Sequence, residues 1–186
     1  RVSHQARPRT QAGMRTNHGG VVIAASNDFR LRNVNTGGRR SSFEHVCCQI
    51  TSCDASCAAL LIYRPGSATI TGTFFNELSD ILHNLATLNV PLIVAGDFNI
   101  PLQTVANPNS RRFLDLLATF GLSSSVHGPT HDCGGWLDVV ATRIDLPAPV
   151  VDIVNPGFSD HRLLEWTSNL DRPAPVYRQV KCRPWR

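Results

Sequence analysis

The sequence lacks any hydrophobic run of the roughly 18–20 residues that a membrane-spanning helix requires, which excludes a spanning segment. It also lacks internal repeats and low-complexity tracts, and the polar stretch after Arg1 has no apolar core typical of a signal peptide. Of its 186 residues, 42% are hydrophobic and 17% are charged, which is typical of a globular chain and not of a disordered one. This length suits one medium domain with a real core.

Lysine is nearly absent, because 17 of the 18 basic residues are Arg, the type suited to bidentate phosphate contacts. Basic residues dominate residues 1–40 and 172–186, whereas acidic residues dominate residues 41–171. One interpretation is that basic flanks bind nucleic acid around an acidic centre that holds a divalent cation. The other, which charge alone favours, is that basic tails only keep the chain soluble.

The six cysteines include no CxxC pair and no Cys/His spacing typical of structural zinc. Cys47 and Cys48 are adjacent within an apolar run, so we expect them on opposite faces of a strand. Buried thiols in a reducing compartment are the favoured interpretation, and a disulfide framework is the alternative.

Hydrophobic periodicity predicts a mixed order of strands and helices. Strands are expected at residues 21–26, 43–51, 58–63, 91–95, 136–143, 149–154 and 162–167, and helices at residues 70–88 and 107–121. Packing the strands face to face with the helices outside predicts an α/β fold, a four-layer α/β sandwich of two mixed sheets flanked by helices.

Three segments show no core pattern. Residues 1–18 are expected to form a disordered arm, residues 27–42 a long exposed loop, and residues 171–186 a basic linker toward a further region downstream. The folded domain is therefore expected at residues 19–170.

Polar side chains follow the strand expected at residues 91–95. Gly96 ends that strand, and Asp97 and Asn99 come next. In an extended backbone, side chains two residues apart share a face, so this carboxylate and carboxamide are expected to project together. Such a pair can bind a cation, orient water and stabilise an oxyanion. The alternative is an ordinary turn, since Gly-Asp and Asn are common turn residues.

Further polar groups lie at other strand ends. Asp160 and His161 are adjacent, so they diverge and suit different partners, a metal for the carboxylate and a phosphate oxygen or water for the imidazole. A capping turn with a solvated His is the alternative. Asp138 interrupts an apolar strand, and His161 is its expected partner because a buried acid is costly unless paired. Tyr63 and Arg64 could bind and neutralise a phosphate, or simply cover the sheet edge.

The order of these segments carries more information than each one alone. They are Tyr63-Arg64-Pro65-Gly66, Gly96-Asp97-Phe98-Asn99, Pro129-Thr130-His131, Leu137-Asp138 and Ser159-Asp160-His161. Together they resemble the endonuclease/exonuclease/phosphatase superfamily, and more narrowly the apurinic-endonuclease-like domain of non-LTR (LINE-type) retrotransposons. The YRPG and PTH segments favour the retrotransposon branch.

The resemblance implies a deoxyribonuclease I-like sandwich with its site at one rim, and Mg²⁺- or Mn²⁺-dependent nicking of DNA that leaves a 3′-OH to prime reverse transcription. It implies that Asp97 activates or orients the attacking water and that Asn99 holds the phosphate. Asp160 and Asp97 would form the metal site. His161, held by Asp138, would contact the phosphate or act as base, so Asp97 and His161 compete for that role.

The remaining implied roles concern substrate and partners. Tyr63 is expected to bind the phosphate, and Arg64, Thr130 and Ser159 to contribute to substrate binding. The expected partners are DNA, the element's RNA and the reverse transcriptase domain of a parent polyprotein, with no membrane. Synthesis is expected in the cytoplasm and action in the nucleus.

One departure from the family pattern concerns the N-terminal side. The family's domain begins with strands that carry an Asn and then a Glu, the principal metal ligand, whereas residues 1–18 contain no Glu and no suitable apolar strand. Glu44 lies where the family has a structural Phe-Glu, so it is not assigned as a ligand. We therefore expect an N-terminally truncated domain. The alternatives are a catalytically dead fragment of such an element, or a superfamily member that acts on RNA or phosphoinositides.

Overall fold

The computed structural model describes residues 2–5, 20–52, 55–104 and 106–167. Its elements in chain order are β1 (Val2–Gln5), β2 (Val21–Ala24), β3 (Arg30–Asn33), β4 (Glu44–Thr51), β5 (Ser56–Tyr63), α1 (Gly72–Ala86), β6 (Leu92–Asp97), α2 (Pro108–Thr119), β7 (Leu122–Ser124), β8 (Asp138–Arg143), β9 (Val151–Val154) and β10 (Leu163–Trp166). Residues 6–18 of the expected arm and the expected linker at 171–186 lie outside the described residues.

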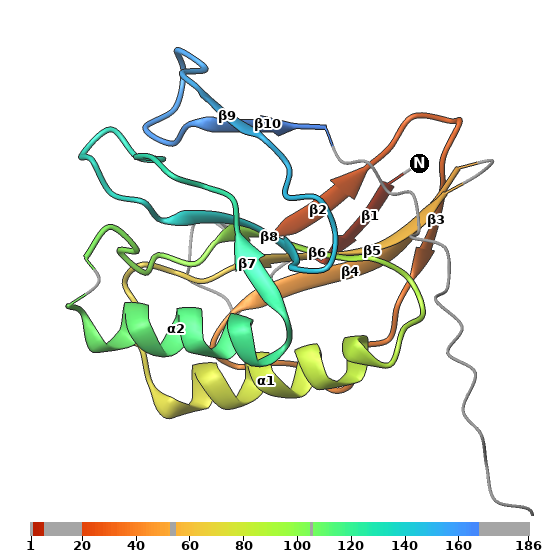
Figure 1. The fold of residues 1–186 in the computed structure, drawn as a ribbon, viewed down its shortest axis with the longest axis horizontal. Helices are drawn as coiled ribbons and strands as arrows, with labels where there is room; N and C mark the ends of the chain where they lie inside the picture. The colour runs from red at the N-terminus through yellow and green to blue at the C-terminus, as the bar shows by residue number, and fades with distance from the viewer. Residues whose placement is uncertain (1, 6–19, 53–54, 105, 168–186) are drawn as a thin grey trace, which may run out of the picture.

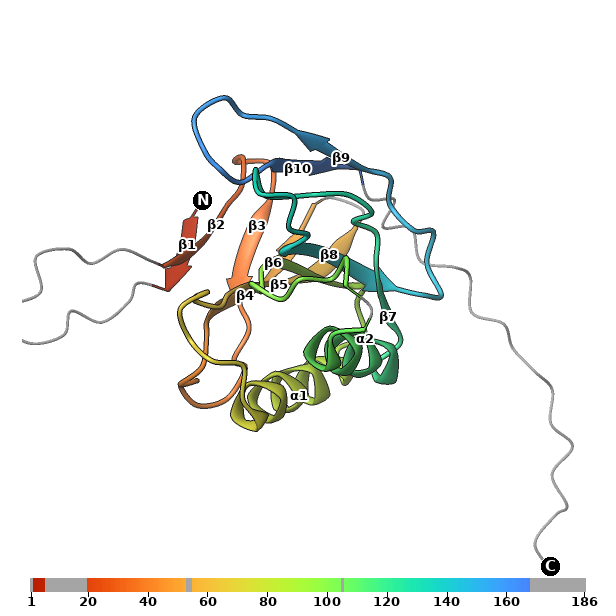
Figure 2. The same ribbon diagram turned by 90° about the vertical axis from the view of Figure 1, so that its left-hand side faces the viewer.

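A six-stranded mixed sheet forms the centre of the molecule, with strand order β3-β4-β5-β6-β8-β7. Strands β5 and β6 are parallel, and the other neighbours are antiparallel. Both helices cover one face of this sheet, and the two-stranded sheets β1–β2 and β9–β10 lie over the other (Figures 1 and 2). The α/β class is as predicted, and one mixed sheet is found. In the described residues the expected second mixed sheet is replaced by the two separate antiparallel pairs β1–β2 and β9–β10, and a second layer of helices is not among them.

The two faces of the central sheet bury different sets of residues, as period-two alternation requires. Cys47 and Leu60 pack toward the helices, in a cluster that includes Leu82 of α1. Cys48 points the other way and packs against Ile23 of β2. The predicted opposite orientation of the two adjacent cysteines is therefore confirmed.

The described cysteines are all free thiols. Cys47, Cys48 and Cys57 are buried, whereas Cys133 is exposed. Burial, together with the neighbouring Cys48 thiol, raises the pKa of Cys47 to about 12, so this thiol stays protonated and unreactive. The prediction of buried thiols is confirmed for these three, and the disulfide alternative finds no pair within the described part of the chain.

The two helices form where the apolar spacing predicted them. Helix α2 begins at the expected Asn107-Pro108 signal, since the Asn107 side chain accepts a hydrogen bond from the Asn109 N–H at 2.9 Å. It ends before Gly121, whose φ of +65° is the left-handed conformation of a C-terminal cap. No helix in the described part of the chain is long and apolar enough to cross a membrane.

Three short strands were not predicted. Residues 2–5 were expected within the disordered arm but pair with β2, and residues 30–33 were expected in a loop but form the edge strand β3. Strand β7 adds three residues to the other edge. Edge strands need only one hydrogen-bonding neighbour and little apolar content, so periodicity within the segment does not reveal them.

Candidate active site

Polar residues at one end of the central sheet lie in a row. Tyr63 of β5 is opposite Asp97 of β6, and Asp97 is opposite Asp138 of β8. Residues in register project to the same face. Ala95 lies two residues before Asp97, and Val140 lies two residues after Asp138, so both are on the same face as these acids. Both pack in the hydrophobic cluster beneath the β9–β10 sheet, which therefore covers that face. Three strands therefore present their terminal polar side chains to one place.

The turn after β6 holds the Asp97 carboxylate in a fixed position. Gly96 is required there, because its φ is +134° and a Cβ would lie 1.9 Å from the carbonyl oxygen of Ile62. Asn99 adopts φ +49°, a left-handed conformation that Asn tolerates. The Asn99 backbone N–H donates to Asp97 Oδ1 at 2.9 Å, and its side-chain amide donates to Asp97 Oδ2 at 2.7 Å. The GDFN segment is therefore a turn and also a clamp on the carboxylate.

Arg64 has a different role from the one that the sequence suggested. Its side chain is buried, with 2% of the residue exposed, and its guanidinium donates to four backbone carbonyl oxygens. The acceptors are Phe98 at 2.6 Å, Asn99 at 2.8 Å, Pro65 at 3.2 Å and Ala68 at 2.6 Å. The expectation that Arg64 contributes to substrate binding is therefore wrong: its donors are used inside the protein, where they tie two loops together beneath Asp97.

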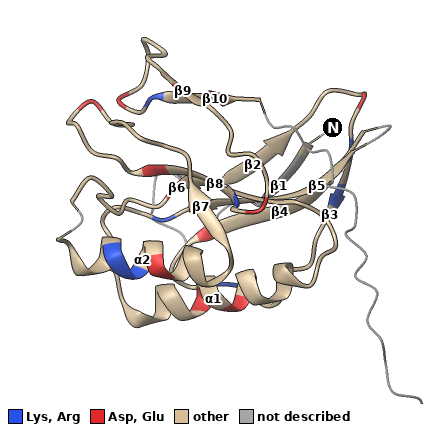
Figure 3. Cartoon of the chain, viewed as in Figure 1, with Lys and Arg blue, Asp and Glu red and all other residues tan. Residues whose placement is uncertain are grey.

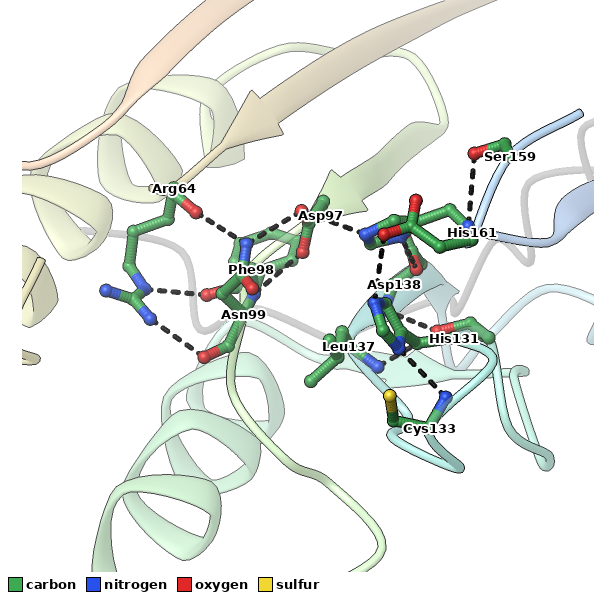
Figure 4. Close-up of polar contacts among 12 residues, drawn as sticks. Arg64, Asp97, Phe98, Asn99, His131, Cys133, Leu137, Asp138, Ser159 and His161 are labelled. Atoms are coloured by element: carbon green, nitrogen blue, oxygen red, sulfur yellow. Dashed lines mark hydrogen bonds and ion pairs between the residues drawn. The ribbon is translucent and has the colours of Figure 1, made fainter. Parts of the chain in front are cut away.

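His161 lies between the two carboxylates (Figure 4). Its Nδ1 is 3.0 Å from Asp138 Oδ2, which is the Asp–His pair expected from the sequence. Since a carboxylate accepts hydrogen bonds, Nδ1 carries the proton and Nε2 of the neutral ring keeps a free lone pair. Nε2 is 4.0 Å from Asp97 Oδ2, which is too far for a hydrogen bond and leaves the two groups facing one another.

The ionisation of both groups is displaced from its ordinary range. Burial and the nearby Asp138 charge raise the pKa of Asp97 to about 6, although the hydrogen bonds from Asn99 oppose this. Burial lowers the pKa of His161, but the hydrogen bond to Asp138 and the charges of Asp138, Asp97 and Asp160 outweigh it and raise that pKa overall. Displaced pKa values of this kind are typical of groups that take part in acid–base catalysis.

The loop before β10 brings Asp160 and Ser159 to the same end of the sheet. The Ser159 hydroxyl accepts a hydrogen bond from the His161 backbone N–H at 3.1 Å, which shapes the turn that places the ring. Asp160 is largely exposed and its carboxylate lies 3.4 Å from His131 Nε2. Both residues thus lie beside the Asp97–His161 pair, with the Ser159 hydroxyl engaged in the turn.

Thr130 is fully buried, and its hydroxyl accepts hydrogen bonds from the backbone N–H groups of Leu137 at 2.9 Å and Asp138 at 3.1 Å. It therefore fixes the start of β8, and the expected contribution of Thr130 to substrate binding would act through the position of Asp138. The next residue, His131, was not assigned a role from the sequence. Its ring lies edge-on to that of His161, with centroids 4.9 Å apart. Its position in the Pro129-Thr130-His131 segment was the sequence feature that could have indicated a role for His131.

The donor atoms fit a divalent cation. Two sets of three side chains offer ligand atoms within 4.8 Å of one another: Asp97, Asp138 and His161, and His131, Asp160 and His161. Carboxylate oxygens are the ligands that Mg²⁺ and Mn²⁺ prefer, and a cation would offset the repulsion that raises the pKa of Asp97. This chemistry agrees with the metal dependence of the family that the sequence resembles.

Comparisons with known proteins agree with this geometry. Residues 3–161 match the Endonuclease/Exonuclease/phosphatase family. No curated protein matches the chain.

Solved structures share the fold at low sequence identity. The endonuclease domain of TRAS1, a telomere-specific non-LTR retrotransposon, superposes with a TM-score of 0.67 at 15% identity, over 92% of this chain and 80% of that one. The human Nocturnin catalytic domain gives 0.60 at 17% identity, over 90% and 72%. The 3′ phosphatase NExo from Neisseria, bound to a product DNA hairpin, gives 0.54 at 16% identity, over 91% and 79%.

These superpositions show a shared deoxyribonuclease I-like fold. The family match over residues 3–161 spans most of the sequence. The chain therefore belongs to the endonuclease/exonuclease/phosphatase family of phosphodiester hydrolases.

Proposed function

We propose that this chain is the metal-dependent DNA endonuclease domain of a retrotransposon polyprotein. It would nick target DNA and leave a 3′-OH that primes reverse transcription. The observation that carries the proposal is the convergence of Asp97 and the Asp138–His161 pair, with His161 3.0 Å from one carboxylate and 4.0 Å from the other. The likeness to the TRAS1 endonuclease domain supports the choice of retrotransposon branch.

The geometry suggests a division of roles at the scissile phosphate. Asp97 in its ionised form takes a proton from the attacking water, whose oxygen then forms a bond to phosphorus. His161 in its protonated form, favoured by Asp138, donates to a phosphate oxygen on which negative charge grows. The bond from phosphorus to the 3′ oxygen breaks, and that oxygen takes a proton from solvent to become the 3′-OH.

The cation would be held by Asp97 and Asp160, as the family resemblance implies; Asp97 shares one set of potential ligands with Asp138 and His161, and Asp160 belongs to a second set with His161 and His131. A bound Mg²⁺ supplies charge that stabilises the phosphate oxygens and lowers the pKa of bound water. Tyr63, half-buried and in register with Asp97, would donate its hydroxyl to the phosphate. Asn99 keeps Asp97 oriented while the proton moves.

DNA as the substrate is supported by two surface features. Phe158, 89% exposed, immediately precedes Ser159 in the loop of the site, where its ring can stack on a base. Exposed arginines lie on α2, at Arg111 and Arg112 (Figure 3). These would contact the phosphate backbone and make binding salt-sensitive.

The same proposal includes partners and location. The DNA target implies action in the nucleus after cytoplasmic synthesis. The element RNA and a reverse transcriptase domain of the same polyprotein would use the 3′-OH. The basic residues at 172–186 would connect to that domain, and they lie outside the described residues.

The proposal is tested by incubating the purified chain with supercoiled plasmid and Mg²⁺. The expected product is the open-circular form, whose nick a DNA polymerase can extend because it ends in 3′-OH. Asp97→Ala is expected to abolish nicking, whereas Asp152→Ala, an exposed acid on β9, should leave it unchanged. Nicking by Asp97→Ala at the wild-type rate would contradict the proposed role of Asp97, and no nicking by the wild-type chain would support a catalytically dead fragment.

A parallel panel separates the substrate classes within the family. The chain would be given single-stranded RNA, a soluble phosphoinositide and the plasmid under the same conditions. Preferential hydrolysis of RNA or of the phosphoinositide would contradict the choice of DNA while leaving the family activity intact.

A further inference from the structure

The segment around His131 is paired with the segment around His161 through the backbone. The Arg162 N–H donates to the Thr130 carbonyl at 2.8 Å, and the Asp132 N–H donates to the Asp160 carbonyl at 2.8 Å. His131 and His161 thus form an antiparallel bridge. The pairing fixes the position of His131 beside the site independently of its side chain.

The protonation of the His131 ring follows from its neighbours. The Cys133 backbone N–H donates to His131 Nδ1 at 3.1 Å, so Nδ1 is the acceptor. The proton of the neutral imidazole is therefore on Nε2. This atom lies 3.4 Å from Asp160 Oδ2.

Asp160 needs such a contact to hold its position. The Asp160 side chain is 70% exposed. The residue lies in the loop between β9 and β10, which also contains Gly157 with a φ of +77°. Within the described residues, His131 is the side-chain partner that the Asp160 carboxylate has. An exposed carboxylate without a partner samples several rotamers, which weakens its use as a metal ligand.

We propose that His131 is a positioning residue, which donates its Nε2–H to Asp160 and orients that carboxylate toward the cation of the site. The inference rests on the proposed function, because the cation belongs to the proposed nuclease mechanism. His131 is not itself a ligand in this arrangement, since metal binding through Nε2 would require the proton to move to Nδ1, where the Cys133 N–H already donates.

The test measures Mn²⁺ binding to the full chain by electron paramagnetic resonance, without any substrate. His131→Ala is expected to weaken Mn²⁺ binding about 10-fold or more, as is usual when the partner of a metal ligand is removed. His131→Gln, whose amide N–H can replace Nε2–H, should restore part of the affinity. His83→Ala, which removes an exposed histidine of α1, is the matched control and should bind as the wild type does.

A double-mutant cycle with Asp160→Asn tests whether the two residues act as one unit. If His131 acts through Asp160, adding His131→Ala to Asp160→Asn causes no further loss of Mn²⁺ affinity. Independent, additive losses would overturn the inference and make His131 a ligand in its own right. An unchanged Mn²⁺ affinity in His131→Ala would overturn it as well.

A second readout needs no metal and separates this inference from the proposed function. The ¹⁵N chemical shifts of the metal-free chain report which ring nitrogen of His131 carries the proton. The inference predicts the Nε2–H form, with a shift change at Nε2 in Asp160→Asn, and the Nδ1–H form would refute it. If the wild-type chain binds no Mn²⁺ at all, the metal-dependent function fails, and with it the role of His131 toward a cation.

Discussion

Replacing Arg64 with lysine keeps the positive charge but removes the planar fork of donors. Arg64 donates from three nitrogens to four carbonyl oxygens at 2.6–3.2 Å, on two separate loops. A lysine ammonium is a single point and can reach only one side of this arrangement. At least two hydrogen bonds from a charged donor are lost, each worth about 1.5–3 kcal/mol, so Arg64→Lys should lower the free energy of unfolding by about 3–6 kcal/mol.

Urea unfolding followed by circular dichroism measures this loss. With a urea dependence of about 2 kcal/mol per molar for a small domain, the midpoint should fall by about 1.5 M or more. Arg111→Lys, an exposed arginine of α2, is the matched control and should unfold as the wild type does. Wild-type stability in Arg64→Lys, together with weaker DNA binding, would refute the structural role and return Arg64 to the phosphate.

Three further predictions concern the site itself. Asp138→Asn should reduce the nicking rate about 10–100-fold. It should also shift the pH–rate profile to lower pH, because the pKa of His161 falls when the Asp138 carboxylate is removed. An unchanged pH–rate profile would contradict the Asp138–His161 pairing. The pKa of Asp97 is about 6 when folded and 3.8 ordinarily, so the folded metal-free chain binds more protons than the unfolded chain between these values. The free energy of unfolding of the wild-type chain, relative to that of Asp97→Ala, should therefore fall by up to about 3 kcal/mol as pH rises through this window. Chemical unfolding at several pH values measures this difference. A free energy of unfolding that rises with pH would contradict the raised pKa of Asp97. Phe158→Ala should weaken DNA binding by about 1–3 kcal/mol in a fluorescence titration without changing the melting temperature, and equal binding would remove base stacking from the account.

The elements with strong apolar periodicity could be predicted from the sequence. The helix expected at residues 70–88 is found at Gly72–Ala86, and the buried strand before Gly96 is found at Leu92–Asp97. The strands at residues 2–5 and 30–33 could not, because their hydrogen bonds come from neighbours far along the chain. Their own residues carry little apolar signal, so tertiary pairing alone determines their conformation.

The candidate site shows the same limit at the level of side chains. The spacing of Asp97 and Asn99 predicted that these two side chains meet, and the isolation of Asp138 in an apolar strand predicted its pairing with His161. The convergence of both pairs at one site was expected from the family resemblance. Arg64 was misread because its acceptors at Phe98 and Asn99 lie more than thirty positions away, and only the fold brings them together. A local motif can indicate which groups carry chemistry, but it does not show which of them are already satisfied inside the protein.

The central claim is that Asp97 and His161 act together on one phosphate at a cation-dependent site. Single-turnover nicking of plasmid DNA at saturating Mg²⁺ by Asp97→Ala, His161→Ala and the double variant tests it most directly. Residues that act as a unit give non-additive losses, so each single variant should lose at least about 10³-fold, and the double variant should be little slower than either. Losses that multiply in the double variant, or wild-type nicking by Asp97→Ala, would contradict the account.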